Sequence, residues 1–319
     1  MPPTTFTFRQ TIPADFQWWL KWLPNEVALH PDLGNALPEL WTRLLADEAM
    51  EARTIVSMTD GVESVDAFGA SVFLRPGLFD EWTARPHRGI VERIYRCVLA
   101  SDSPLLTGRE LPKANSGAGV DVCVLHFCER PVDLNTPVGQ QLLAMGHAAF
   151  RDAHLGYHIR SIVHETFQPV HKALLLASGM AQLHECAPQP TGDCSDPRPS
   201  TQVGMTRVQS LAEPAGSTIS LLFRSEPPRY YFSASERRVL RAALAGRSDA
   251  DIAAQLLVTR DAVKKVWRNV FARVGEVANG SAPGASSPMP PRRRQLLEYI
   301  RQHPEELRPF VRPSKWPNE

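Results

Sequence analysis

The sequence predicts a mixed α/β N-terminal domain followed by an all-α C-terminal domain. Between residues 120 and 186, apolar strand-like runs alternate with helical segments, which is the pattern of a sheet covered by helices. Between residues 233 and 275, three short segments with helical apolar spacing follow one another without a strand. The chain has 319 residues, of which 43% are hydrophobic, so it is long enough for two domains with a core in the larger one.

The N-terminal part of the sequence predicts several helices and one strand. Their pattern is less regular than that of the segments that follow. Trp18 and Trp22 share a helical face after Asp15, a candidate N-cap, so we expect them to pack in a core; a ligand or dimer surface is the alternative. The elements expected next are a helix at 37–50, a strand at 65–74, a helix at 89–100 and a loop at 105–119.

Strands and helices alternate most clearly between Val120 and Cys186. The run Val120–Cys128 is almost continuously apolar, which predicts a central strand. The elements expected after it are a helix at 137–153, a strand at 157–165, a helix at 169–178 and a short strand at 181–186. This order implies a right-handed parallel crossover for the first pair of strands.

The order of elements, with the pair Gly179-Met180 before the last strand, resembles the second half of the GNAT acetyltransferase fold. That family holds the diphosphate of acetyl-CoA on a glycine-rich turn at the start of a helix. The corresponding stretch here, Leu134 to Gln141, contains the single glycine Gly139. The resemblance therefore favours a sensing or scaffold domain over an active acetyltransferase.

The segment between the two domains is rich in proline at 187–200, which predicts a linker. After it, Arg207–Leu211 and Ser217–Phe223 are expected to form a pair of strands. The predicted domains are 1–188 (α/β), 189–229 (linker and β-hairpin), 230–277 (helical) and 278–319 (flexible linker and basic helix).

Capping residues mark the ends of the three C-terminal helices. Ser233 and Glu236 have the spacing of a capping box, in which the two side chains satisfy free backbone donors. Gly246 is suited to end the first helix, and Ser248 and Thr259 are suited to begin the second and third.

The third helix has one apolar side and one polar side. At about 100° per residue, Val263, Trp267 and Val270 fall on one side. The opposite side carries the charged residues Asp261, Lys264, Lys265 and Arg268. Such a helix suits the major groove of DNA, where phosphates attract its charge; a solvated basic surface is the alternative.

Residues 233–275 resemble the LuxR-type helix-turn-helix domain of bacterial transcription regulators. The resemblance rests on Ser233, Glu236, Val239, Leu240, Gly246, Ser248, Ile252, Ala253, Val263 and Lys264. It implies that the third helix ends at Gly275. It also implies DNA contacts by Thr259, Arg260, Asp261, Lys264, Lys265 and Arg268.

The chain departs from that family in three places. Ala262 and Val266 replace polar residues that often contact DNA, and a Gly/Ser/Pro linker at 279–288 stands where a fourth helix is usual. A helix becomes plausible again only at Arg292–His303, so the usual dimer contact is in doubt.

The charge is distributed unevenly along the chain. From Tyr230 onward there are 16 Lys and Arg against 9 Asp and Glu, whereas the first 229 residues have 19 against 25. A basic tail on an acidic body favours a polyanionic partner.

Metal-binding and catalytic patterns are weak. His126 and Cys128 share a strand face, and Cys123 is expected on the other, so these three are read as core residues. His147 and His154 lie on one helix and are also read as structural. We therefore expect no catalytic residue, no metal site and no cofactor.

These observations predict a DNA-binding transcriptional regulator that is not an enzyme. The expected partners are double-stranded DNA, a second copy of the chain, RNA polymerase and an unknown small-molecule effector. No signal peptide or membrane span is recognised, so a cytoplasmic location is expected. The alternative is an acetyltransferase-like enzyme with an accessory helix-turn-helix module.

Overall fold

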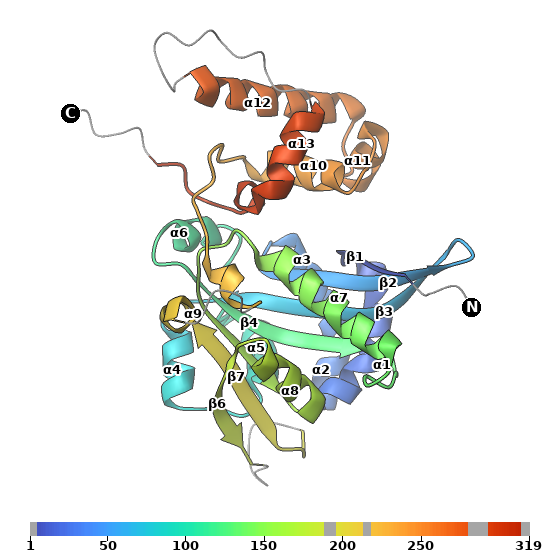
Figure 1. Cartoon of the computed structure of the whole chain (residues 1–319), viewed down its shortest axis with the longest axis vertical. Helices are drawn as coiled ribbons and strands as arrows, with labels where there is room; N and C mark the ends of the chain where they lie inside the picture. Colours follow the sequence, from blue (N-terminus) through green and yellow to red (C-terminus); the bar gives the residue numbers. More distant parts are fainter. Residues whose placement is uncertain (1–4, 188–195, 213–217, 280–292, 314–319) are drawn as a thin grey trace, which may run out of the picture. The chain divides into compact units, whose positions relative to one another are not determined.

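A computed structural model describes residues 5–187, 196–212, 218–279 and 293–313. The chain divides into two compact units. The first comprises residues 1–111, 118–155 and 159–224, and the second comprises residues 112–117, 156–158 and 225–319. Figure 1 labels the helices and strands.

The first unit is built on one seven-stranded mixed sheet with the order β1-β2-β3-β4-β5-β7-β6. Strands β4 and β5 are parallel, and all other neighbours are antiparallel. The strands are β1 (Phe6–Gln10), β2 (Met50–Thr59), β3 (Val62–Leu74), β4 (Val120–Glu129), β5 (Ile159–Thr166), β6 (Ala181–Cys186) and β7 (Ser200–Thr206).

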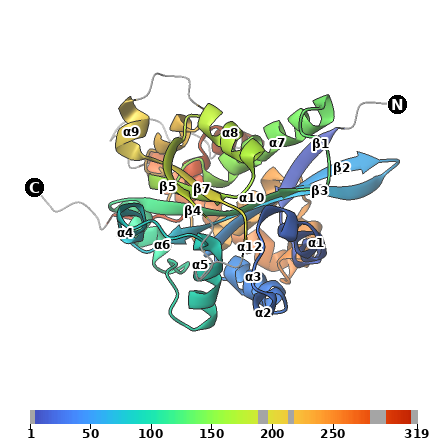
Figure 2. The same cartoon turned by 90° about the horizontal axis from the view of Figure 1, so that it is seen from below.

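Helices cover both faces of this sheet (Figure 2). One face carries α7 (Pro137–His154), α8 (Pro169–Ala177) and α9 (Arg207–Ala212). The other carries α1 (Phe16–Glu26), α2 (Pro31–Gly34), α3 (Leu37–Ala46) and α5 (Ile90–Leu99). The remaining elements are η1 (Pro13–Asp15), α4 (Leu78–Ala84) and the 3-10 turn η2 (Ser220–Phe223).

The main core lies between the sheet and α1, α3 and α5. Trp19 is fully buried and stacks on Phe68 of β3 with ring centroids 4.3 Å apart. Trp22 is also buried, whereas Trp18 packs against this core only in part. Core packing of the tryptophan segment is thus confirmed, with Trp19 at its centre. Asp15 makes no side-chain cap of α1 and instead pairs with Arg9 at 2.7 Å.

Several predicted elements of this unit agree with the structure, and others were wrong. The predicted strand at 120–128 and the helices at 89–100, 137–153 and 169–178 correspond to β4, α5, α7 and α8. The predicted strand pair at 207–223 was wrong, because Arg207–Ala212 is helical and Ser220–Phe223 is a 3-10 turn. Part of the predicted loop at 105–119 is α6 (Leu111–Ser116), of which residues 112–116 belong to the second unit.

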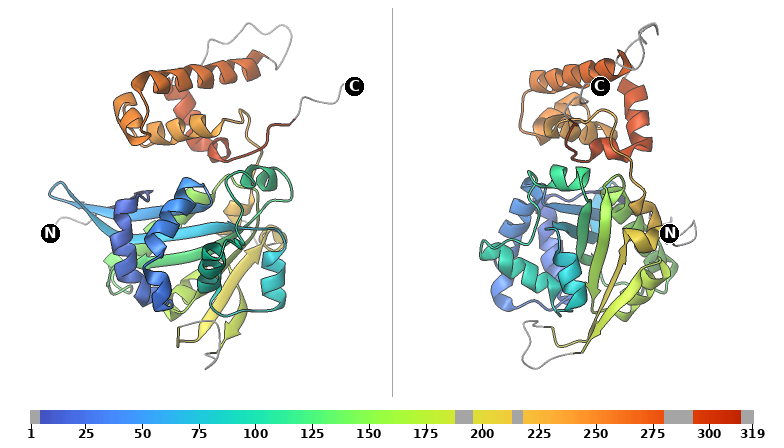
Figure 3. Two further views of the ribbon diagram at one scale, coloured as in Figure 1. Left: turned by 180° about the vertical axis from the view of Figure 1, so that it is seen from behind. Right: turned by 90° about the vertical axis from the view of Figure 1, so that its left-hand side faces the viewer.

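The second unit is helical (Figure 3). It contains α10 (Ala234–Leu244), α11 (Asp249–Gln255), α12 (Arg260–Asn279), α13 (Arg293–Gln302) and the 3-10 turn η3 (Pro304–Leu307). The capping box of Ser233 and Glu236 is confirmed, and Ser248 forms a second one with Asp251. Gly246 has a φ of 79°, which a left-handed helix end requires.

The third helix of this unit is longer than expected, because α12 passes through Gly275 to Asn279. Most of the linker predicted after it lies outside the described residues. Helix α13 agrees with the helix expected at 292–303, and its Leu296 and Ile300 are buried in the same core as Val263 and Val270 of α12. This helix therefore completes the core of its own unit. The predicted domain limits and the dimer stay predictions.

None of the described helices is long and apolar enough to cross a membrane. A cytoplasmic location stays a prediction.

Candidate functional site

The parallel strands β4 and β5 separate halfway along their length. Their pairing ends at Val124 opposite His164, although β4 continues to Glu129 and β5 to Thr166. Beyond this pair, β4 is paired with β3 and β5 with β7. In open α/β sheets, ligands bind where the carboxyl ends of parallel strands part. The gap between β4 and β5 is therefore the first place to look for a site.

A β-bulge in β4 sets which side chains reach the gap. Ala70 of β3 pairs with His126 and Ser71 pairs with Val124, so Leu125 is the extra residue. Because of this insertion, Cys123, Leu125 and Cys128 all lie in the main core. The expectation that Cys123 points away from Cys128 was wrong. Burial raises the pKa of the Cys123 and Cys128 thiols, which agrees with the interpretation of these cysteines as core residues.

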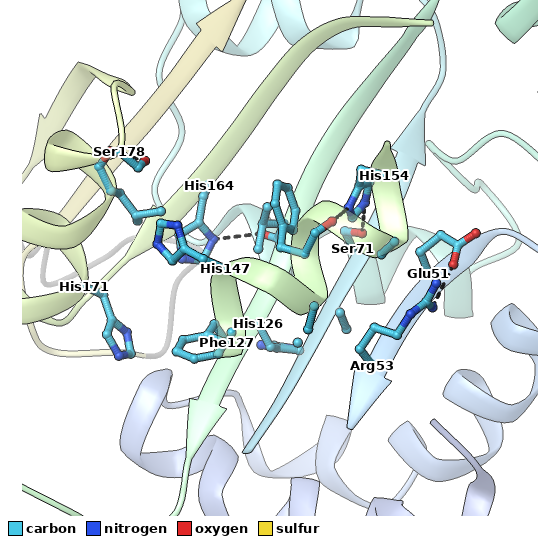
Figure 4. Close-up of a pocket in the computed structure, with 18 of the residues that line it drawn as sticks. Glu51, Arg53, Ser71, His126, Phe127, His147, His154, His164, His171 and Ser178 are labelled. Carbon is cyan, nitrogen blue, oxygen red and sulfur yellow. Dashed lines mark hydrogen bonds and ion pairs between the residues drawn. The ribbon is translucent and has the colours of Figure 1, made fainter. Parts of the chain in front are cut away.

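A cavity of about 100 Å³ lies where α7 and α8 cover the sheet. Figure 4 shows Ser71 and His154 at one end and His171 at the other, with His126 and Phe127 between them. Phe127 comes close to α7, because a Cβ atom on Gly146 would lie 2.5 Å from its ring. The polar residues that line the cavity are Glu51, Arg53, Ser71, His126, His147, His154, His164, His171 and Ser178.

His171 joins two glutamates through the gap. Its Nδ1 lies 3.1 Å from Glu26 Oε2, and its Nε2 lies 3.3 Å from Glu129 Oε2. Glu26 ends α1, Glu129 ends β4 and His171 belongs to α8. Helices α1 and α8 lie on opposite faces of the sheet (Figure 2), so Glu26 and His171 come to this contact from opposite faces. We call Glu26, Glu129 and His171 the gap triad.

The gap triad holds one positive and two negative formal charges. Burial lowers the pKa of His171, but the two glutamates outweigh this and raise it to about 10, so the imidazole is protonated at neutral pH. Glu26 Oε1 is buried and accepts no hydrogen bond from the described residues, whereas Glu129 Oε2 contacts His171 as an ion pair without hydrogen-bond geometry. Arg198, whose guanidinium donates to the Glu26 backbone carbonyl, pairs with Asp196 at 2.6 Å.

The other two histidines near the gap are neutral. Burial lowers the pKa of His126 to about 3, and burial also lowers that of His164. The indole N–H of Trp41 donates to the Tyr95 hydroxyl oxygen at 2.9 Å, so that hydroxyl donates to His126 Nε2 at 2.6 Å. His164 Nδ1 donates to the Val124 carbonyl at 3.0 Å, at the point where the strands part. His171 is thus the charged histidine of this cluster.

The start of α7 does not fit the diphosphate of acetyl-CoA, the acyl donor that the GNAT resemblance implies. Pro137 has no N–H, and the N–H of Gly139 donates to the Thr136 hydroxyl at 3.2 Å. A Cβ atom on Gly139 would lie 2.4 Å from the Asp133 carbonyl oxygen, so the preceding loop occupies the space beside the helix. Two of the first three backbone positions of α7 therefore offer no free donor to a diphosphate.

The residues predicted to contact DNA lie on the exposed side of α12 or just before it. Thr259, Arg260, Asp261, Lys264, Lys265 and Arg268 are all exposed. Thr259 caps the helix through Ala262 N at 3.2 Å, and Lys264 pairs with Asp261 at 3.1 Å. None of the six lines the cavity. Their contact with DNA stays a prediction.

The sequence did not point to the gap triad. Glu26 and His171 are far apart in the chain, and only the fold brings them together. His154 was read as structural, and the structure adds that it is buried against Ser71 in the cavity wall. Within the described residues, no group of three or more His, Cys, Asp or Glu side chains is arranged to hold a metal ion.

Comparisons with known proteins found distant structural matches and no sequence match. No protein-family model and no curated protein sequence matches the chain. A mutant of the spermidine N-acetyltransferase SpeG from Vibrio cholerae matches with 9% identity and a TM-score of 0.38, over 63% of this chain and 93% of that one. A phosphinothricin acetyltransferase from Sinorhizobium meliloti matches with 16% identity and a TM-score of 0.37, over 69% and 100%. The C-terminal condensation domain of Ebony, in complex with beta-alanyl-dopamine, matches with 10% identity and a TM-score of 0.40, over 64% and 100%.

These matches contradict the prediction of a LuxR-type, DNA-binding transcriptional regulator that is not an enzyme. Two of the three are acetyltransferases by name, and none is a regulator by name. They agree better with the alternative, an acetyltransferase-like enzyme. The prediction went wrong because it took the function from the 43 residues at 233–275 and gave the larger unit only a sensing role.

Proposed function

We propose that the first unit is an acyltransferase that transfers a short acyl group to an amine at the gap between β4 and β5. The observation that carries this proposal is the charge of the gap triad. Two carboxylates share one imidazolium, which leaves one formal negative charge in a largely buried place. Buried charges require partners, and an alkylammonium ion supplies the missing one.

The groups of the triad suit the two proton movements of acyl transfer to an amine. An ammonium ion held by Glu26 and Glu129 loses a proton to the Glu26 carboxylate, whose Oε1 accepts no hydrogen bond from the described residues. The free amine nitrogen then attacks the carbonyl carbon of an acyl thioester. The new C–N bond forms, the C–S bond breaks, and the amide nitrogen loses its second proton to Glu129.

The leaving sulfur also needs a proton. His171 is protonated at neutral pH because its pKa is about 10, so it can give this proton to the thiolate. The glutamates have then gained two protons: one returns to His171, the other is released to water, and the triad recovers its first state. No step in this scheme uses the diphosphate of a coenzyme, because the start of α7 does not fit one.

The test is an amine-dependent release of thiol from a small acetyl thioester, S-acetyl-N-acetylcysteamine, with spermidine as the first acceptor. We expect Glu26→Gln and His171→Gln to lower kcat/KM by about 100-fold, the lower end of the effect of general acid–base groups. Glu185→Gln is the matched control, because the Glu185 side chain on β6 is 64% exposed and pairs only with Lys172 among the described residues.

Two results would overturn the proposal. The first is that the wild-type chain releases no more thiol with a series of primary amines than without them. The second is that Glu26→Gln and His171→Gln react as fast as Glu185→Gln. Acetyl-CoA serves as a second donor, and we expect its kcat/KM to lie close to that of the short thioester.

The finer resemblance of residues 233–275 to a LuxR-type helix-turn-helix stays a prediction about the fold of α10, α11 and α12. The two capping boxes and the buried apolar side of α12 support it. An experimental structure of the full chain tests it.

A further inference from the structure

Ser71 and His154 form a buried hydrogen-bonded pair at the end of the cavity away from the gap triad (Figure 4). The Ser71 Oγ lies 2.6 Å from His154 Nε2, and His154 Nδ1 lies 2.8 Å from the backbone carbonyl of Phe150. A carbonyl oxygen only accepts, so Nδ1 of His154 carries a proton and donates it to Phe150. In the neutral imidazole, Nε2 then accepts the proton of the Ser71 hydroxyl.

The fold holds both residues firmly. Ser71 lies in β3, where it pairs with Glu51 of β2 and Val124 of β4. His154 is the last residue of α7, and the rings of Phe150 and Phe73 pack around its imidazole at centroid distances of 4.2 and 6.4 Å. Both side chains are about 98% buried or more, and both line the cavity.

This arrangement has the parts of an activated nucleophile. Such a site needs a hydroxyl within about 2.6–3.2 Å of a base, and a third group that orients the base. Here these parts are Ser71 Oγ, His154 Nε2 and the Phe150 carbonyl.

We propose that Ser71 is a nucleophile that accepts a short acyl group from an ester and releases it to water. In the first half of the reaction, Ser71 Oγ forms a bond to the acyl carbonyl carbon and the bond from that carbon to the leaving oxygen breaks. His154 Nε2 takes the Ser71 proton and passes it to the leaving alcohol. In the second half, His154 takes a proton from water, the hydroxide displaces Ser71, and the proton returns to Ser71 Oγ.

The size of the cavity sets the class of substrate. Its volume of about 100 Å³ is only a few times the roughly 30 Å³ that one water molecule occupies in the liquid. An acetyl or propionyl group fits into this volume, whereas a long acyl chain does not. This activity needs neither an amine nor the gap triad, so it is independent of the proposed amine transfer.

The test uses p-nitrophenyl acetate with no amine present. We expect a burst of nitrophenolate and a covalent adduct with the mass of one acetyl group, which peptide mapping places on Ser71. Ser71→Ala should abolish both. His154→Gln should slow the burst by about 100-fold or more, as loss of a general base does.

Ser178→Ala is the matched control, because Ser178 lines the same cavity but donates to the Leu175 carbonyl and not to a histidine. It should keep the burst and the adduct. Thermal unfolding of each variant shows whether it is folded, and Ser71→Cys is a second variant that should form a thioester adduct at position 71 if Ser71→Ala fails to fold. An adduct at another residue, or no adduct in the wild-type chain, would overturn the proposal.

Discussion

Glu26 and His171 come from helices on opposite faces of the sheet, and their side chains meet 3.1 Å apart. They meet because β4 and β5 stop pairing at Val124 and His164. This ion pair requires that the Glu26 carboxylate is ionised and that the His171 imidazole is protonated. This relationship leads to the first prediction.

Stability should depend on pH through His171. Its pKa rises from an ordinary value of 6.5 to about 10 in the folded chain, so folding favours its protonated form. The stabilisation by the gap triad is therefore complete below about pH 6.5 and is lost as the pH rises toward 10. Urea unfolding across this range measures it, with His171→Gln as the reference that lacks the titration. Parallel pH profiles for the two proteins would show that His171 is not paired as described.

Replacing Glu165 should destabilise the first unit. The Glu165 carboxylate accepts the N–H groups of Gly89 and Ile90 at 3.0 and 2.7 Å, and so caps the start of α5 from β5. Glu165→Ala leaves these buried donors without an acceptor, which costs about 3 kcal/mol in the free energy of unfolding. Glu165→Gln should cost less, because its amide oxygen still accepts. Denaturant unfolding compares both with exposed Glu185→Ala, and equal losses in all three would refute the capping role.

Two helical glycines should respond oppositely to alanine. A Cβ atom at Gly146 of α7 would lie 2.5 Å from the Phe127 ring, so Gly146→Ala should destabilise by about 1–3 kcal/mol through overpacking. Nothing lies within 4 Å of a Cβ atom at Gly275 of α12, so Gly275→Ala should stabilise its unit by up to about 1 kcal/mol. Calorimetric unfolding measures both changes. If Gly146→Ala with Phe127→Leu is no more stable than Gly146→Ala alone, contact with the ring is not the cause.

The sequence predicted the elements whose signals are local. The apolar run of β4, the periodicity of α7 and the capping box of Ser233 and Glu236 all lie within a few residues, and each is present in the structure. Another local signal was overlooked. Thr206 and Gln209 exchange hydrogen bonds as a capping box, and this arrangement begins α9 where a strand was predicted.

Strand β7 shows why pairing could not be predicted from local pattern. Its residues Ser200–Thr206 have neither a continuous apolar run nor clear alternation, and they follow a proline-rich segment. The strand forms because it lies between β5 and β6, where both of its edges are paired and its side chains are buried. Its burial comes from tertiary position, which overrides β-propensity.

The candidate site was even less accessible to sequence reasoning. The bulge at Leu125 changes which face of the sheet each of the following residues points to. The sequence pattern of β4 does not reveal that a bulge is present. Glu26, Glu129 and His171 come from three elements, and their charges matter only because the two parallel strands part between them. The pair of Ser71 and His154 likewise joins a strand to the end of a helix.

The central claim is that the gap triad supports acyl transfer to an amine. The most direct measurement is mass-spectrometric detection of N-acetylspermidine after incubation of the full chain with S-acetyl-N-acetylcysteamine and spermidine at neutral pH. We predict that the wild-type chain and Glu185→Gln form this product well above the uncatalysed rate, and that Glu26→Gln forms about 100-fold less. Product formation at the uncatalysed rate by the wild-type chain, with spermidine and with other primary amines, would contradict the claim.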